Sequence, residues 1–114
     1  MSAPTALKIL TAQQWAAFQS TGRFEGAPVD LADGYIHMST ADQAAETLSK
    51  HFGGQDDLVL AQVALAPLGD ALKWEVSRGG QLFPHHYGVL TLADVITHAP
   101  IVLGADGRHI LPAL

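Results

Sequence analysis

Hydrophobic and polar residues follow two patterns along the chain: the two-residue alternation of strands and the three-to-four-residue spacing of helices. Both patterns occur in the N-terminal third. Residues 6–10 (ALKIL) form a short apolar-rich run that predicts a strand. The pattern Thr11-Ala-Gln-Gln14 matches a capping box, which predicts a helix that follows it. That helix is expected to end near Gly22, because glycine tolerates a left-handed cap. Residues 23–34 contain Pro and Gly without a sustained period and therefore predict a surface loop.

The middle of the chain predicts a short strand, a second helix and a buried strand. Residues 35–39 alternate, so that Ile36 and Met38 share one face and the opposite face carries Tyr35, His37 and Ser39. A second capping box at 40–43 opens a helix that is expected to run to about residue 52. Residues 58–65 (LVLAQVAL) are apolar at odd and even positions alike, which is typical of a central strand covered on both faces.

A clean alternation returns at residues 72–76 (LKWEV). A strand with this pattern is expected to turn Leu72, Trp74 and Val76 toward the core, while Lys73 and Glu75 share the other face. Residues 77–81 contain two glycines and predict a flexible loop.

Shorter signals complete the C-terminal part. Pro84 cannot donate to a sheet ladder, so the strand-like segment 82–88 is expected at an edge or in an irregular stretch. The remaining signals are a helical turn at 91–94, a strand through 101–103, a hairpin turn at Asp106-Gly107 and a short closing strand. The element order predicts a single small α+β domain over residues 1–114, with two main helices and a largely antiparallel sheet.

Composition narrows the possible classes of protein. The chain has 114 residues, 48% of them hydrophobic and 15% charged, with a net charge of −5, which fits one folded domain and excludes intrinsic disorder. It has no cysteine, which excludes disulfides, cysteine zinc sites and thiol nucleophiles and favours a reducing cytoplasm. No signal peptide is visible, and the apolar runs are too short to span a membrane. The acidic balance makes nucleic acid an improbable partner.

The first segment that could carry chemistry is 33–39, where a histidine and a serine lie just before a helix N-terminus. His37 can exchange a proton near neutral pH, and the Ser39 hydroxyl can hold a sugar or phosphate oxygen. The amides at the start of the helix favour an anion. The structural alternative is that Ser39 or Thr40 only caps the helix and that His37 satisfies a backbone carbonyl.

The second segment is 74–80 (WEVSRGG). Arg78 precedes two glycines, where the backbone can approach a ligand and the guanidinium can clamp a carboxylate or phosphate. Gly-Gly pairs also mark ordinary turns. Glu75 and Lys73 could be a functional pair or merely an exposed cross-strand pair of little energetic weight.

The third segment is 82–88 (LFPHHYG). Adjacent side chains on an extended strand point to opposite faces, so His85 and His86 cannot easily bind one metal ion together. His85 shares its face with Tyr87. The structural alternative is that one histidine packs inside while the other is solvated. His51, in the last turn of the second helix, is expected to complement the helix dipole.

These segments together carry a resemblance to a known family. The motifs are 33–40 (DGYIHMST), 51–54 (HFGG), 72–75 (LKWE), 77–80 (SRGG) and 82–88 (LFPHHYG). They resemble the small bacterial proteins grouped as domain of unknown function 952, over about residues 6–103. The resemblance implies an α+β fold similar to the ADP-ribosylation fold, which ADP-ribosyltransferases and RNA 2′-phosphotransferases share. It implies no established reaction, because a fold does not fix a function.

The resemblance to that fold also implies roles for individual residues. In its transferases an early strand supplies a histidine to the NAD ribose, an aromatic side chain stacks on nicotinamide, and a later glutamate supports the oxocarbenium-like transition state. His37 is similar to the histidine that contacts the ribose, and Glu75 is the candidate for the glutamate. The candidates for the stacking aromatic residue are Tyr35, Trp74 and Tyr87. The phosphotransferases need several arginines, whereas this chain has only Arg23, Arg78 and Arg108.

The expected function is binding of a nucleotide-like, NAD-like or other small anionic ligand, with transferase-type chemistry. The expected cleft is lined by Tyr35, His37, Ser39, Glu75, Arg78, His85 and Tyr87. His37 would orient or deprotonate a ribose hydroxyl, Glu75 would stabilise positive charge, and Arg78 would hold a phosphate or carboxylate.

Two other classes of function stay open. A metal-dependent hydrolase could use His37, His51, His85 or His86 with Glu75 or Asp33, although the chain has no H-x-H or H-x-x-x-H pair. A non-catalytic binding or interaction module would use the same motifs mainly for structure. Its sign would be His37 and Arg78 bonded to protein carbonyls without a cleft around them.

Overall fold

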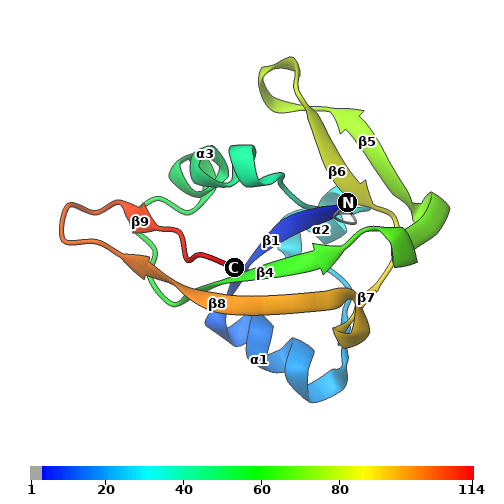
Figure 1. The fold of residues 1–114 in the computed structure, drawn as a ribbon, viewed down its shortest axis with the longest axis horizontal. Coiled ribbons are helices and arrows are strands. Elements are labelled where there is room, and N and C mark those ends of the chain that lie inside the picture. Colours follow the sequence, from blue (N-terminus) through cyan, green and yellow to red (C-terminus); the bar gives the residue numbers. More distant parts are fainter. Residues whose placement is uncertain (1–3) are drawn as a thin grey trace.

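The computed structural model describes residues 4–114, and its elements are linked by short turns (Figure 1). In chain order these are β1 (Thr5–Thr11), α1 (Ala12–Thr21), β2 (Arg23–Phe24), α2 (Pro28–Asp33), β3 (Ile36–His37), α3 (Ala41–His51), β4 (Leu58–Ala64), η1 (Ala66–Ala71), β5 (Leu72–Val76), η2 (Arg78–Gly80), β6 (Leu82–His86), β7 (Leu90–Thr91), η3 (Leu92–Asp94), β8 (Val95–Leu103) and β9 (His109–Ile110). The η elements are 3-10 turns.

The largest sheet has the strand order β1-β4-β8-β9, and its neighbouring strands are antiparallel. Its two faces carry separate hydrophobic clusters. On one face Leu10 and Val63 pack with Trp15 and Phe18 of α1, in the α1-side core. On the other face Ile9 and Leu60 pack with Leu48 of α3, in the α3-side core. Figure 1 shows the sheet between these two helices.

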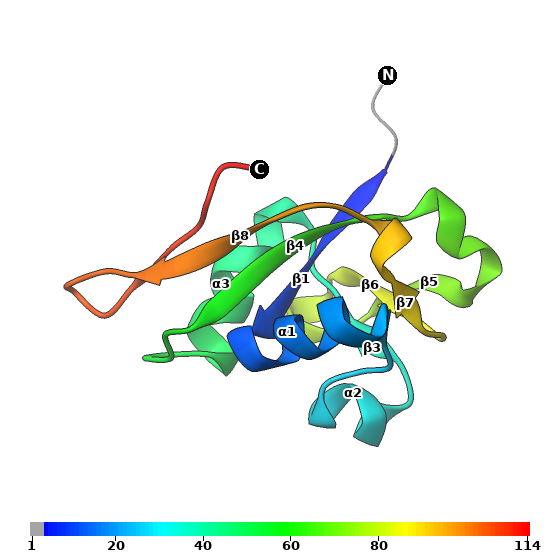
Figure 2. The same ribbon diagram turned by 90° about the horizontal axis from the view of Figure 1, so that it is seen from below.

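A second sheet of three strands, in the order β3-β6-β5, stands beside the first (Figure 2). Both of its pairs are antiparallel. An isolated bridge between Leu7 and Ser39 joins the chain just after β3 to β1. Ile36 and Met38 reach into the α1-side core, so the second sheet is anchored through the face that these residues share.

Several predictions from the sequence are confirmed. The Thr11 hydroxyl accepts from the Gln14 amide at 3.0 Å and the Gln14 side chain accepts from the Thr11 amide at 2.9 Å, which completes the first capping box. Gly22 ends α1 with φ of 78°, in the left-handed region. β4 is a central strand between β1 and β8, and Gly107 lies in the turn between β8 and β9. The α+β class with antiparallel sheets is therefore correct.

The prediction of a loop over residues 23–34 is wrong, because the segment contains β2 and a third helix, α2. Pro28 occupies the first turn of α2, where its missing N–H costs nothing. The Asp30 side chain accepts from the Ala27 amide at 2.8 Å, and Gly34 provides a left-handed end. The six residues of α2 are too few for a visible helical period, which is why the pattern indicated a loop.

The predicted inward face of β5 is correct for Leu72, which packs against the α1-side core, and wrong for Trp74 and Val76. Trp74 is 45% exposed and Val76 is 69% exposed, while Leu72 is half-buried. The alternation of LKWEV separates two faces, and the face with Lys73 and Glu75 is the one that packs against polar and aromatic side chains of β6. The apolar face of β5 therefore meets the core only at Leu72 and extends beyond it at Trp74 and Val76.

The placement of 82–88 at an edge is wrong as well, because β6 is the middle strand of its sheet. Pro84 lies opposite residue 38, just beyond the end of β3, and its carbonyl still accepts from the Met38 amide at 3.1 Å although the proline has no N–H to donate in return. His85 and His86 do point to opposite faces, but both are buried, so neither is solvated.

No helix within residues 4–114 is long and apolar enough to cross a bilayer.

Candidate active site

One face of the three-stranded sheet gathers most of the polar side chains that the sequence singled out. His37 of β3, His85 of β6 and Lys73 of β5 are successive cross-strand partners. Partners in antiparallel strands point to the same face, so these side chains form a row across the sheet. Tyr35 and Tyr87 have the same parity as His37 and His85. We call this surface the His37–His85 face.

The first side-chain cluster on this face is a histidine bound to a buried carboxylate. Asp30, in α2, is only 1% exposed. Its Oδ1 accepts from the His37 amide at 3.0 Å and from His37 Nδ1 at 2.6 Å. A short helix therefore holds a carboxylate under β3, and the carboxylate fixes the orientation of the His37 ring.

A buried lysine neutralises the same carboxylate. Nζ of Lys8, in β1, donates to Asp30 Oδ2 at 3.0 Å and to the His37 carbonyl at 2.9 Å. Burial tends to raise the pKa of Asp30, but the hydrogen bonds from His37 and the charge of Lys8 outweigh it and lower the pKa to about 2. Burial lowers the pKa of Lys8, although the attraction to Asp30 opposes that shift. Lys8, Asp30 and His37 thus form one network that links β1, α2 and β3.

The other nitrogen of His37 faces the surface. Nε2 lies 2.9 Å from Oδ2 of Asp33, whose side chain is 47% exposed. Nε2 is the end of the ring where a ligand could replace Asp33 and exchange a proton.

The second side-chain cluster is centred on Glu75. Oε1 of Glu75 accepts from His85 Nδ1 at 2.9 Å and from the Tyr87 hydroxyl at 2.7 Å. The hydrogen bond from Tyr87, followed by the one from His85, lowers the pKa of Glu75. The same bond to the carboxylate raises the pKa of Tyr87 to about 12. Glu75 is thereby held ionised, and Tyr87 is held as a phenol.

Tyr35 connects the two clusters. Its ring centroid is 4.2 Å from that of His85, 4.6 Å from that of His37 and 5.1 Å from that of Tyr87. The two imidazole centroids are 5.5 Å apart. Burial, with smaller contributions from Asp33 and Glu75, raises the pKa of Tyr35. The result is a patch of packed aromatic rings bordered by carboxylates.

A surface hollow of about 300 Å³ borders this patch. Its size is at the lower end of the range for small-molecule sites. It is lined by Glu25, Asp30, Leu31, Gly34, Tyr35, Ile36, Tyr87, Gly88 and Val89. A planar ligand in the hollow would lie beside the rings of Tyr35 and Tyr87.

Two of the predicted site residues have their contacts elsewhere, at α3. The Ser39 hydroxyl lies 2.9 Å from that of Thr47. Arg78 donates to the same Thr47 hydroxyl at 3.1 Å, forms an ion pair with Glu46 at 3.2 Å and lies over the Phe83 ring. The structure therefore brings Tyr35, His37, Glu75, His85 and Tyr87 together, whereas Ser39 and Arg78 belong to a separate cluster. These contacts therefore do not form the expected single cleft that includes Arg78.

Sequence reasoning missed three members of the site. Asp33 lies within the first motif, where the sequence indicates it only as a possible metal ligand. Asp30 and Lys8 carried no motif at all, and only the Pro28-x-Asp30 spacing, typical of a helix start, could have indicated an acid with a capping role.

The metal hypothesis finds no geometric support. Within the part of the chain that the structure describes, no three His, Cys, Asp or Glu side chains are placed to hold a metal ion. His51 is the last residue of α3 and is exposed. His86 lies on the core side of the sheet, where Nε2 donates to the Val89 carbonyl at 3.3 Å. Among the buried side-chain nitrogen and oxygen atoms of residues 4–114, His86 Nδ1 is the one without a hydrogen-bond partner.

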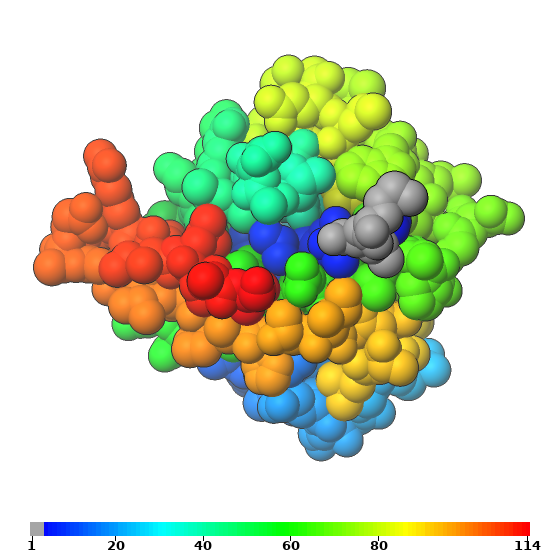
Figure 3. All heavy atoms as spheres, in the orientation of Figure 1, coloured from blue at the N-terminus to red at the C-terminus, as the bar shows by residue number. Residues whose placement is uncertain are grey.

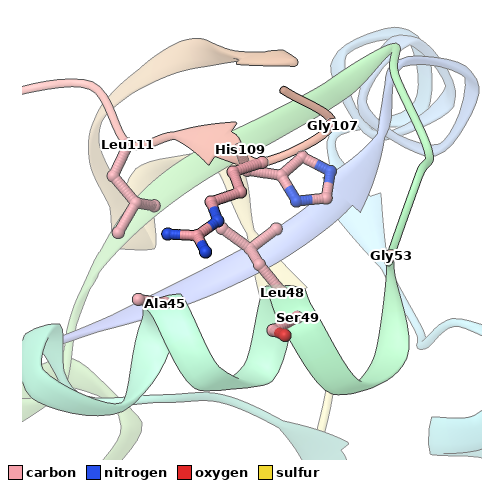
Figure 4. Close-up of a pocket in the computed structure, with 8 residues that line it drawn as sticks. Ala45, Leu48, Ser49, Gly53, Gly107, His109 and Leu111 are labelled. Atoms are coloured by element: carbon pink, nitrogen blue, oxygen red, sulfur yellow. The ribbon is translucent and has the colours of Figure 1, made fainter. Parts of the chain in front are cut away.

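A larger hollow, of about 390 Å³, lies between α3 and the β8–β9 hairpin (Figure 4). Leu48 and Ser49 of α3 form one wall, and His109 and Leu111 lie opposite. Arg108 also lines this hollow and has no acidic side chain within ion-pair distance in residues 4–114. This hollow, which we call the α3–β9 hollow, shares no lining residue with the His37–His85 face.

Comparison with known proteins places the chain in a family. No curated protein matches it. Its fold matches the crystal structure of protein CC0527 from Caulobacter crescentus with a TM-score of 0.90 and 50% identity, over 94% of both chains. The solution NMR structure of CC0527 matches with a TM-score of 0.82 and 51% identity, over 91% of this chain and 90% of that one. The family model described as "Protein of unknown function (DUF952)" covers residues 9–98, so the chain belongs to the DUF952 family.

Proposed function

We propose that the His37–His85 face is the active site of a transferase-type enzyme that works by acid–base chemistry on a nucleoside-like ligand. The observation that carries the proposal is the arrangement of two imidazoles, each bound through Nδ1 to a carboxylate, which both contact the Tyr35 ring and lie next to each other. Histidine–carboxylate pairs that meet beside a hollow are a recurrent arrangement for moving protons.

Each side chain has a defined role in this proposal. His37 exchanges a proton at Nε2 with a ligand hydroxyl that takes the place of Asp33, while Asp30 keeps the ring oriented through Nδ1. Glu75 stabilises positive charge that develops on the ligand. Tyr35 and Tyr87 provide the surface on which a base or a nicotinamide ring would stack.

The charges at the site favour a neutral or cationic group over a polyanion. Asp33 and Glu75 border the face, and the charge of Lys8 is already paired with Asp30. NAD therefore fits in part: the positively charged nicotinamide suits the carboxylates, but the pyrophosphate has no arginine, because Arg78 is held by Glu46 and Thr47. Stacking rings, a histidine that meets a ligand hydroxyl and a nearby carboxylate are also what the ADP-ribosylation fold uses. They support the proposed relation to that fold. The absence of cysteine supports a cytoplasmic location.

The proposal is tested by titration calorimetry with adenosine, nicotinamide riboside, ADP-ribose and NAD. We expect a nucleoside to bind, and His37→Gln and His85→Gln to weaken that binding by about tenfold or more. His51→Gln is the matched control, because His51 is exposed at the end of α3, and it should leave binding unchanged. Failure of every compound to bind the wild-type protein would refute the proposal.

The α3–β9 hollow supports a second candidate function, non-catalytic binding of a small anionic ligand. The supporting observation is Arg108, a cation without an acidic partner in residues 4–114, at the border of a hollow with an apolar wall. The same titrations separate the two candidates: an anion that binds here loses affinity in Arg108→Ala and keeps it in His37→Gln.

A further inference from the structure

The β5–β6 hairpin leaves one strand with an open edge. β5 is the last strand in the order β3-β6-β5, and Figure 1 shows it as the outermost strand of that sheet. The same hairpin forms a yellow-green lobe at the surface in Figure 3. Its outward face carries Trp74, Val76 and Leu82, which are 45%, 69% and 52% exposed. A hydrophobic edge strand of this kind is a site where another strand can pair.

The hydrogen-bond pattern shows which backbone groups of β5 are open. The Tyr87 amide donates to the Ala71 carbonyl, and the Ser77 amide donates to the Gln81 carbonyl. Residues 71, 73, 75 and 77 therefore direct their backbone groups toward β6. In an antiparallel ladder the intervening residues direct theirs the other way. The N–H and C=O groups of Trp74 and Val76 and the C=O group of Leu72 thus point away from the sheet, whereas the Leu72 amide already donates to the Gly69 carbonyl at the end of η1.

We propose that two copies of this protein associate through β5, antiparallel, about a two-fold axis at Trp74. In this register Trp74 lies opposite the partner's Trp74, and Leu72 lies opposite the partner's Val76. The Trp74 N–H and C=O groups then pair with those of the partner's Trp74, and the Val76 N–H donates to the carbonyl of the partner's Leu72. The two three-stranded sheets become one six-stranded sheet.

The charges of β5 select this register over its neighbours. With Trp74 on the axis, Lys73 lies opposite the partner's Glu75, and the reverse pair forms on the other side of the axis. A shift by two residues instead places Lys73 opposite the partner's Lys73, or Glu75 opposite the partner's Glu75. Directly opposed like charges are destabilising, whereas unlike charges in a cross-strand pair are favourable. The strand is therefore complementary to itself in one register.

The pairing would also bring a cation to the candidate active site. Oε1 of Glu75 accepts from both His85 and Tyr87, and no bond to Oε2 is formed within residues 4–114. Lys73 of the partner subunit would meet this second oxygen. The dimer itself is argued from the strand edge and does not depend on the proposed chemistry.

A cysteine cross-link tests the register, because the chain has no cysteine of its own. In Trp74→Cys the two Cα atoms would be about 5.5 Å apart, as in a hydrogen-bonded antiparallel pair, and this is within disulfide reach. Val76→Cys is the matched control on the same exposed edge. Its two copies would be four residues out of register, about 13 Å apart, beyond that reach. We expect mild oxidation to yield a covalent dimer of the first variant only.

Sedimentation over a concentration series tests the association without removing Trp74. Wild-type protein is expected to dimerise reversibly. Lys73→Glu and Glu75→Lys should each weaken self-association by about tenfold or more, because each opposes like charges. An equal mixture of the two variants should restore dimers, since unlike charges then meet. A wild-type chain that stays monomeric at millimolar concentration, or equal cross-linking at positions 74 and 76, would overturn the proposal. Nucleoside titration of a monomeric chain still tests the active site separately.

Discussion

At the scale of single residues, the interior charge of this protein is concentrated in one network. Lys8 and Asp30 are both buried, and Asp30 also receives two hydrogen bonds from His37. Removing one member of a buried ion pair leaves the other desolvated and unpaired, which costs more than the pair itself contributes. The network therefore stabilises the fold and orients a candidate catalytic histidine with the same contacts.

Asp30→Asn should lower the free energy of unfolding by about 3–5 kcal/mol, because it leaves Lys8 without a counter-charge in the interior. Lys8→Met should cost less, since Asp30 retains the His37 donors. Urea denaturation measures both, and Asp33→Asn is the control at an exposed carboxylate with one contact to the same ring. A loss below about 1 kcal/mol for Asp30→Asn would contradict this assignment.

The low pKa of Asp30 predicts a loss of stability in acid. The carboxyl titrates near 4 in the unfolded chain and at about 2 in the folded one, so the unfolded state takes up this proton first as the pH falls. The stabilisation is complete above pH 4 and is lost between about pH 4 and pH 2, amounting to about 2–3 kcal/mol. Urea midpoints of wild type and Asp30→Asn at pH 5 and pH 2 should converge in acid. A gap that stays constant with pH would count against it.

The sequence predicted some members of the site and not others for a physical reason. His37, Glu75, His85 and Tyr87 stand out because polar side chains are rare in their segments. Asp30 does not stand out, since its burial depends on Lys8, which lies 22 positions away on another element. The pairing of a charge with a distant strand is a tertiary property, and no local pattern reports it.

At the scale of elements, local signals worked where the chemistry is local. The Thr11–Gln14 box and Gly22 define both ends of α1 because caps and left-handed turns involve only neighbouring residues. β5 shows the limit of such signals. Its alternation separates Trp74 from Glu75, but the covered face is decided by Tyr35 and His85 from other segments.

The start of α1 offers a prediction at this scale. Thr11→Ala removes the hydroxyl that accepts from the Gln14 amide and should lower the free energy of unfolding by about 1 kcal/mol. Thr11→Ser keeps a hydroxyl at the same position and is expected to retain most of the stability. Chemical denaturation of the two variants side by side checks this, and equal losses would mean that the hydroxyl does not act as the cap.

At the scale of the whole molecule, β1 and β4 tie the two cores together. Leu10 and Val63 belong to the α1-side core, while Ile9 and Leu60, on the same two strands, belong to the α3-side core. Loss of either core would expose one face of the sheet, and the other core packs against the opposite face of that same sheet. The second sheet is attached to the same unit through Ile36 in the α1-side core and through the Leu7–Ser39 bridge.

We therefore expect residues 4–114 to unfold as one cooperative unit, and the two tryptophans report on its opposite parts. Trp15 is buried in the α1-side core, whereas Trp74 lies on the exposed edge of the second sheet. In Trp74→Phe fluorescence follows the core, and in Trp15→Phe it follows the hairpin. Within each variant the urea midpoint from fluorescence should coincide with that from circular dichroism, at a dilution that excludes self-association. If the Trp74 signal changes at lower urea than the dichroism of the same variant, the β5–β6 hairpin opens before the cores, and the second sheet is a separate folding unit.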